Sequence, residues 1–398
     1  MKKIAAITLI LMFSLQINAQ ENVILENLNT LISKLKSEYA PDKRVALWDV
    51  EVKKEGDDYV LVGETNLPRA FDKLTSKIKK NKKVMNKVEL LPAKSLGEEN
   101  YGIVNLSVAN MRSKPGHPAE LATQTLLGTV LKIYKKRAGF YYVQTPDMYL
   151  AWMDDDGLFR VNKSQVDEWL NAEKVIYIKD YGFSYNKPDK NSQRVSDLAL
   201  GNLLKLKQTH EDFVEVSYPD GRIAFVEKEF VMDYSEWLKI TKPGKKKILE
   251  RAHSFMGIPY LWGGTSTKGM DCSGFTKTVY YMSGVVLPRD ASQQVHTGEL
   301  VDTKNGFDNL QPGDLLFFGT KKTKEKKERI THVGIYIGDG DFIHASGMVK
   351  VNSLDKSKPN FSQYRFDNFI RAKRILTSIN KNGITTLKTN NFYNGDNL

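Results

Sequence analysis

The chain contains a single cysteine, Cys272, and the residues around it suit a nucleophile. Apolar residues follow it at helical spacing, at Phe275, Val279 and Met282. They share one face with Cys272 in a helix expected over Cys272–Ser283. The thiol therefore stands at the helix N-terminus, where unpaired backbone N–H groups and the helix dipole favour negative charge. This placement predicts a thiol biased toward thiolate, with amide groups nearby that could hold an oxyanion.

Two histidines on consecutive expected strands could supply the base. His332 could accept the thiol proton while His344 fixes its tautomer and ring orientation. A three-residue loop, Gly338–Gly340, would oppose His344 to Gly334 and make the two imidazoles neighbours on one face. A two-residue turn would send them to opposite faces unless a bulge compensates. Only the first register supports a catalytic pair, and Gly340 suits the left-handed conformation that such loops use.

Other chemistries lack their residues. One cysteine excludes an intrachain disulfide, and the sequence contains neither a His-Glu-x-x-His zinc motif nor a phosphate-binding glycine loop. We therefore expect no metal and no cofactor. Arg289 with Asp290 is expected to form a structural pair, and Asp314 to brace the turn beside Gly313.

The N-terminus has the pattern of a secretory signal peptide. Lys2 and Lys3 precede the apolar run Ile4–Leu15, and Ile17–Ala19 supplies a small-residue cleavage pattern. Residues 1–19 are therefore expected to be removed, leaving an exported protein that is periplasmic or extracellular. No later run is long and apolar enough to predict a transmembrane helix.

The formal net charge of +12 would favour an anionic polymer such as cell-wall material or nucleic acid, or could serve solubility alone. The basic residues are spread along the chain, which favours solubility. The main exception, Lys321–Arg329, has no interleaved aromatic residues and is expected to be an exposed loop. We therefore expect no nucleic-acid partner.

The first mature segment, residues 20–95, is expected to be a small α/β segment. We expect helices over Val23–Tyr39 and Pro68–Lys80, and strands over Arg44–Lys53 and Asp58–Glu64. Proline at the first helical position suits the start of the second helix.

An internal repeat follows. A shift of 73 residues aligns Met111–Met153 with Ser184–Val226 without a gap, and the aligned residues are turn and core positions of short strands. The repeat predicts two small all-β barrels, residues 96–165 and 166–238. Their spacing of strands and Gly/Pro/Asp turns resembles bacterial SH3-like domains.

Residues 239–376 are expected to form an α+β domain, with helices first and antiparallel strands after. The helices are expected at Lys245–Met256 and Cys272–Ser283, and the strands at Leu315–Phe318, His332–Ile337, Phe342–Ser346 and Val349–Asn352. Residues 377–398 are expected to be a polar, poorly ordered tail.

Six motifs within residues 245–376 carry a resemblance. In chain order they are Pro259–Gly264, Asp271–Phe275, Leu287–Arg289, Gln311–Leu315, His332–Gly338 and Phe342–Ala345. Together they resemble the NlpC-type cell-wall peptidases, which have a papain-like fold. The resemblance implies Cys272 as nucleophile, His332 as base and His344 as the third, orienting member. The chain is thus expected to be multidomain, with a papain-like domain at its C-terminal end.

Two SH3-like units before such a domain resemble the γ-D-glutamyl-L-diamino acid endopeptidases, whose substrate begins with a free L-Ala. The resemblance implies that the substrate is bound by Tyr260, Asp271, Ser273, Glu120 and Tyr149. At the 73-residue shift, Glu120 aligns with Gln193 and Tyr149 with Arg222, so the second copy lacks both proposed ligands. A carboxylate is the group expected to bind an ammonium terminus.

The expected reaction is hydrolysis of the γ-D-Glu–L-diamino acid bond in peptidoglycan-derived peptides. Two other classes stay open at this point. One is a wall-binding protein whose peptidase domain is inactive, which a missing Cys or His would have favoured. The other is a thiol amidase or acyltransferase on the same fold.

Overall fold

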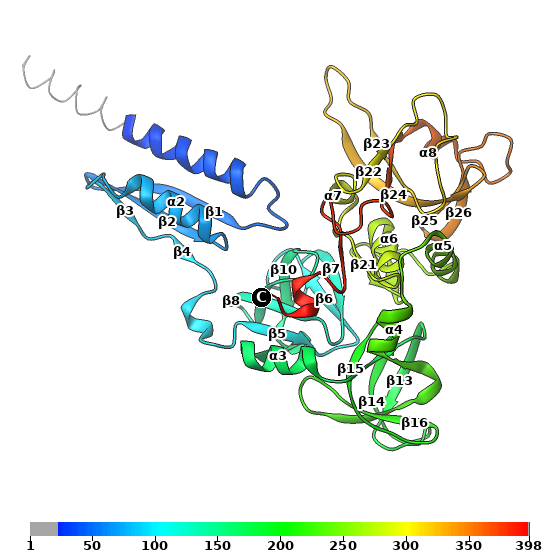
Figure 1. The fold of residues 1–398 in the computed structure, drawn as a ribbon. Coiled ribbons are helices and arrows are strands. Elements are labelled where there is room, and N and C mark those ends of the chain that lie inside the picture. Colours follow the sequence, from blue (N-terminus) through cyan, green and yellow to red (C-terminus); the bar gives the residue numbers. More distant parts are fainter. Residues whose placement is uncertain (1–22, 397) are drawn as a thin grey trace, which may run out of the picture. The chain divides into compact units, whose positions relative to one another are not determined.

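The computed structural model describes residues 23–396 and 398. The chain divides into two compact units, with the boundary between Gly97 and Glu98 (Figure 1). The expected signal peptide, residues 1–19, lies outside the described residues. Each unit is described by itself.

The N-terminal unit is a small α/β domain, as expected. Residues 23–39 are helical. The elements that follow are β1 (Trp48–Glu55), β2 (Asp58–Thr65), α2 (Pro68–Ile78), β3 (Val84–Asn86) and β4 (Glu89–Leu90). β1 and β2 form an antiparallel hairpin, and β2 also pairs in parallel with β3 and β4. Leu35, Trp48, Tyr59 and Leu74 are buried between the helices and the sheet.

The second unit opens with a seven-stranded sheet, here called the first β unit. Its strands are β5 (Tyr101–Val104), β6 (Val108–Arg112), β7 (Leu121–Leu126), β8 (Val130–Arg137), β9 (Phe140–Gln144), β10 (Leu150–Asp154) and β11 (Leu158–Val161). Their spatial order is β11-β5-β8-β9-β10-β6-β7. Helix α3 (Lys163–Asn171) follows and buries Trp169 against this sheet.

A second seven-stranded sheet, the second β unit, repeats this topology. Its strands are β12 (Lys174–Tyr177), β13 (Tyr181–Tyr185), β14 (Arg194–Ala199), β15 (Leu203–Thr209), β16 (Phe213–Ser217), β17 (Ile223–Glu227) and β18 (Val231–Asp233). Each strand begins 73 residues after its counterpart, and the spatial order is the same. The predicted repeat is confirmed, and it extends to β5 and β12, outside the segments aligned by sequence.

The C-terminal region, residues 234–398, places helices before an antiparallel sheet. Its helices are α4 (Tyr234–Ile240), α5 (Lys245–Ser254), α6 (Cys272–Tyr281), α7 (Ala291–Gln294), α8 (Gln363–Asp367) and α9 (Asn391–Asn394). The main sheet runs β22 (Glu299–Val301), β27 (Phe369–Arg374), β23 (Leu315–Thr320), β24 (Arg329–Gly338), β25 (Asp341–Ser346) and β26 (Met348–Ser353). Helix α6 packs against β24 and β25. Phe275 and Val279 are fully buried with Val333, Ile335 and Ile343.

The prediction of a poorly ordered tail is wrong. β28 (Thr385–Thr386) pairs with β21 (Val285–Val286), and Ile384, Leu387 and Phe392 are buried. Nδ2 of Asn390 donates to the Pro146 carbonyl of the first β unit at 2.8 Å. The apolar residues of this segment are too widely spaced for a sequence pattern, but Ile384 and Leu387 join the main core of the C-terminal region.

Candidate active site

Helix α6 begins at Cys272, as predicted. Asp271 caps it, because its Oδ1 accepts the Gly274 backbone N–H at 2.7 Å. Cys272 is 7% exposed, and the backbone N–H groups of Ser273 and Val333 point toward its sulfur. Since Val333 lies on β24, the thiol faces the strand that carries His332.

Burial opposes the expected bias of the Cys272 thiol toward thiolate. Burial raises the pKa of the Cys272 thiol to about 11, and the Asp271 carboxylate adds to the shift. The backbone amides and Arg289 act in the opposite direction but do not offset it. The position of a thiol in a helix can be inferred from sequence, whereas the cost of ionising it depends on how completely the fold removes water.

The hairpin β24–β25 brings the two histidines together. Ile335 pairs with Ile343, and this register opposes His344 to Gly334. The turn itself has two residues, Asp339 and Gly340, both at positive φ. A register shift after Tyr336 keeps the two histidines on one face despite this short turn. The predicted register is therefore confirmed, through a short turn with a bulge in place of a three-residue loop.

The two imidazoles are in direct contact. Nε2 of His332 lies 2.7 Å from Nδ1 of His344, and the ring planes are at 90°. A Cβ at Gly334 would come within 3.1 Å of the His344 Cβ, so glycine provides room for this contact.

Asn352 on β26 fixes the tautomers of the pair. Its Nδ2 donates to the Asn360 carbonyl at 3.1 Å, so its Oδ1 accepts from Nε2 of His344 at 2.9 Å. Nδ1 of His344 is then unprotonated and accepts the proton on Nε2 of His332. This leaves Nδ1 of His332 with a free lone pair, the requirement for a base.

Both histidines are neutral near pH 7. Burial lowers the pKa of His344 to about 4 and that of His332 well below its ordinary value, and the Arg365 charge lowers the pKa of both. Neutral rings are also what the hydrogen-bond chain from Asn352 requires. Asn352 was not among the residues predicted from the sequence, although strand alternation opposite Phe342 puts it diagonally beside His344.

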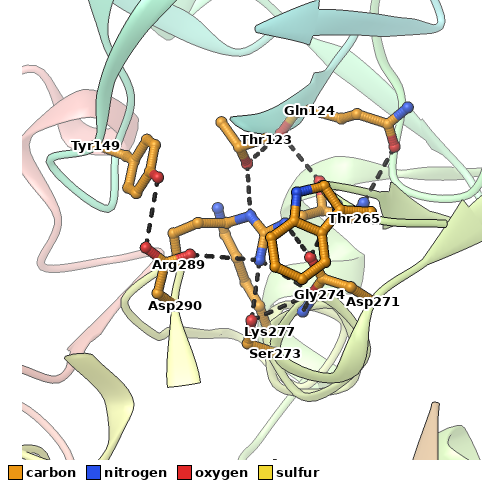
Figure 2. Close-up of polar contacts among 12 residues, drawn as sticks. Thr123, Gln124, Tyr149, Thr265, Asp271, Ser273, Gly274, Lys277, Arg289 and Asp290 are labelled. Carbon is orange, nitrogen blue, oxygen red and sulfur yellow. Dashed lines mark hydrogen bonds and ion pairs between the residues drawn. The ribbon is translucent and has the colours of Figure 1, made fainter. Parts of the chain in front are cut away.

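A buried ion pair supports the start of α6 (Figure 2). Arg289 is 1% exposed, and its Nη2 lies 2.5 Å from Oδ2 of Asp271. Its Nη1 donates to Oγ of Ser273 at 3.0 Å, and its Nε donates to Oγ1 of Thr123 on β7 at 2.9 Å. Burial alone would raise the pKa of the Asp271 carboxyl, but Arg289 and two backbone amides hold it below its usual range.

This geometry corrects the expected pairing of Arg289. Nη1 of Arg289 is 3.9 Å from Oδ1 of Asp290, so Asp271 is the main ion-pair partner of Arg289. Asp314, in contrast, accepts the Gln311 backbone N–H as a turn residue should, and it also pairs with Arg374.

The first β unit contributes two of the expected substrate ligands at this site. Oε1 of Glu120 accepts from the Trp262 indole N–H at 2.8 Å, and the Tyr149 hydroxyl donates to Oδ2 of Asp290 at 3.4 Å. A Cβ at Gly263 would lie 2.3 Å from the Leu121 carbonyl oxygen, so this approach of the two parts requires glycine. The role of Trp262 was not predicted from the sequence, since its partner Glu120 lies 142 residues away.

Tyr260 lies near the nucleophile and is half-buried. Burial raises the pKa of Tyr260 to about 12, and the negative forms of Cys272 and Asp271 add to the shift. Asp271 and Ser273, both buried, are bound by Arg289. Their roles toward a substrate stay predictions.

A buried cysteine at a helix N-terminus, facing a sheet with two hydrogen-bonded histidines, defines a papain-like cysteine peptidase. The NlpC/P60 family model matches residues 257–371, and the model of the bacterial dipeptidyl-peptidase SH3 domain matches residues 111–158. The chain belongs to the NlpC/P60 family of cysteine peptidases.

Relatives match beyond the peptidase domain. A gamma-D-glutamyl-L-lysine dipeptidyl-peptidase of Bacillus cereus is 32% identical over 57% of this chain and 67% of its own length. A protein of the same name from Bacillus subtilis is 33% identical over 56% of this chain and 72% of its own length. The crystal structure of an NlpC/P60 family protein from Bacillus cereus is 25% identical, with a TM-score of 0.59 over 69% of this chain and 99% of the other.

Among the described residues, none of the helices is both long and apolar enough to span a membrane.

Proposed function

We propose that this protein is an exported endopeptidase that hydrolyses the γ-D-Glu–L-diamino acid bond of peptidoglycan stem peptides with a free N-terminal L-Ala. The hydrogen-bond chain Asn352–His344–His332, which leaves a basic nitrogen on His332 beside the Cys272 helix, carries the proposal. The names of the Bacillus relatives support the bond, and the signal-peptide pattern of residues 1–19 supports export.

The reaction begins from a neutral thiol and a neutral imidazole. As the Cys272 sulfur attacks the γ-carbonyl of D-Glu, its proton passes to Nδ1 of His332, so no preformed ion pair is needed. The backbone N–H groups at the start of α6 stabilise the oxyanion. His332 then protonates the leaving amine of the diamino acid, and water hydrolyses the thioester with His332 again accepting a proton.

The substrate's free amine is held where the first β unit meets the C-terminal region. Glu120 offers a carboxylate next to Trp262, Tyr149 contacts Asp290, and Tyr260 lies near Cys272. Asp271 and Ser273, held in place by Arg289, are the other two expected substrate ligands. The second β unit lacks the equivalents of Glu120 and Tyr149, which supports a ligand role over a role in barrel stability.

Defined muropeptides and mass spectrometry test the proposal. The expected products of L-Ala-γ-D-Glu-L-Lys are L-Ala-γ-D-Glu and lysine, and Cys272→Ala should abolish both cleavage and alkylation by iodoacetamide. Binding without cleavage would indicate a wall-binding protein, and transfer to an added amine would indicate an acyltransferase. Either result would contradict the proposal.

A further inference from the structure

Arg365 lies on the histidine face of the sheet. It belongs to α8, and its guanidinium carbon is 5.7 Å from the centroid of the Phe318 ring, which is itself 5.9 Å from the His332 ring. Nη2 of Arg365 is 3.5 Å from Oγ of Ser346, which lies two residues after His344 on β25. Strand alternation puts Ser346 and His344 on one face, so the guanidinium shares their surroundings.

The guanidinium of Arg365 has no carboxylate partner among the described residues. Three other arginines of the C-terminal region do have a carboxylate partner: Arg289 pairs with Asp271, Arg371 with Glu328, and Arg374 with Asp314. Arg365 is only partly exposed, and burial lowers its pKa. A partly desolvated charge without a partner is unfavourable unless an anion binds it in the functional state.

Apart from the long hydrogen bond to Ser346, the contacts of the Arg365 guanidinium leave its N–H donors unused. Its guanidinium makes cation–π contacts with the rings of Phe318 and Tyr364, and its central carbon is 5.3 Å from the centroid of the Tyr364 ring. These contacts involve the flat face of the guanidinium. The guanidinium edge carries five N–H donors in a planar fork, and that fork matches the two oxygens of a carboxylate.

The position of Arg365 indicates which carboxylate of the substrate it could bind. In the proposed reaction His332 protonates the leaving amine, so the leaving group must lie beside the His332 ring. That amine and the carboxylate of the same diamino acid share one α-carbon. The free N-terminal amine, in contrast, is assigned to Glu120 of the first β unit. The carboxylate of the leaving group is therefore expected beside the His332 ring, on the face of the sheet that carries Arg365.

We propose that Arg365 binds the carboxylate of the leaving L-diamino acid, which makes a free carboxyl group at the third position a specificity determinant. This inference rests on the proposed function. It has a consequence for the chemistry, because the Arg365 charge lowers the pKa of His332. A bound carboxylate would neutralise that charge and so favour the imidazolium that must form when Cys272 attacks.

The test compares L-Ala-γ-D-Glu-L-Lys with its C-terminal amide. For the wild type we expect KM to be roughly tenfold or more higher for the amide, as for loss of a charged hydrogen bond. Arg365→Gln should raise KM for the acid by a similar factor and change the amide little, while Arg365→Lys restores part of the preference. Arg371→Gln is the matched control, because it removes a guanidinium that pairs with Glu328 at the surface. Equal loss for both peptides in Arg365→Gln, or no wild-type preference, would overturn the inference.

Calorimetric binding separates this inference from the proposed function. Both peptides are titrated into Cys272→Ala, with Arg365 intact or replaced by Gln, after circular dichroism confirms folding. If the wild type fails to cleave the γ-D-Glu–L-Lys bond, the proposed function is wrong. Arg365-dependent preference for the acid in binding would still support the carboxylate site. Equal binding of acid and amide, or no binding of either, would reject that site.

Discussion

His332 and His344 share a single hydrogen bond of 2.7 Å and are both less than a tenth exposed. Because burial lowers the pKa of His344 to about 4, the folded protein keeps this ring neutral where the unfolded chain, with an ordinary pKa of about 6.5, takes up a proton. Stability from the neutral pair is therefore complete above pH 6.5 and is lost as the pH falls toward 4.

We expect this linkage to reduce the free energy of unfolding by about 3 kcal/mol for His344 between pH 6.5 and 4. Urea titrations at several pH values measure it. His344→Gln should reduce the dependence on pH and leave the part that comes from His332, whereas His253→Gln, at an exposed histidine of α5, should leave it unchanged. A wild-type stability that stays constant across this range would contradict neutral burial of the pair.

Breaking the Asp271–Arg289 pair should strongly reduce the free energy of unfolding, because both side chains are buried. Asp271→Asn leaves a buried guanidinium with only the more distant Asp290 carboxylate as a countercharge, and the expected cost is about 3–5 kcal/mol. The matched control is Glu328→Gln, which breaks the more exposed pair with Arg371 and should cost under about 1 kcal/mol. Chemical denaturation measures both. A similar decrease in the free energy of unfolding for the two variants would contradict the larger contribution expected from the buried pair.

The parts of the site that follow from local pattern were predictable. The helix start at Cys272 follows from apolar spacing, and the His332–His344 register follows from strand alternation. The thiol's pKa could not be predicted, since it depends on burial by residues far along the chain. The partners of Arg289 and Glu120 also lie on other elements, at separations that sequence spacing does not encode. Asn352 was predictable only in part, because its strand was predicted but its hydrogen bond to His344 was not.

The packed C-terminal segment should contribute to stability. Phe392 is 6% exposed in α9, and Phe392→Ala should reduce the free energy of unfolding by about 3 kcal/mol. Leu300→Ala, at a residue 65% exposed on β22, is the control and should have little effect. Thermal unfolding followed by circular dichroism compares them. No difference between the two variants would mean that the segment does not hold Phe392 in the core.

The contact between Glu120 and Trp262 allows a sharp test of amine recognition. Glu120→Gln keeps an oxygen that can accept the Trp262 indole N–H, but it removes the charge that would bind the substrate's ammonium group. The wild type should cleave L-Ala-γ-D-Glu-L-Lys at least about tenfold better than its N-acetylated form, since acetylation leaves the carboxylate without its cation. Glu120→Gln should erase this preference by reducing kcat/KM only for the free amine. Gln193→Ala, at the equivalent position of the second β unit, should preserve it. Equal cleavage of the free and acetylated peptides by the wild type would remove Glu120 from the substrate site.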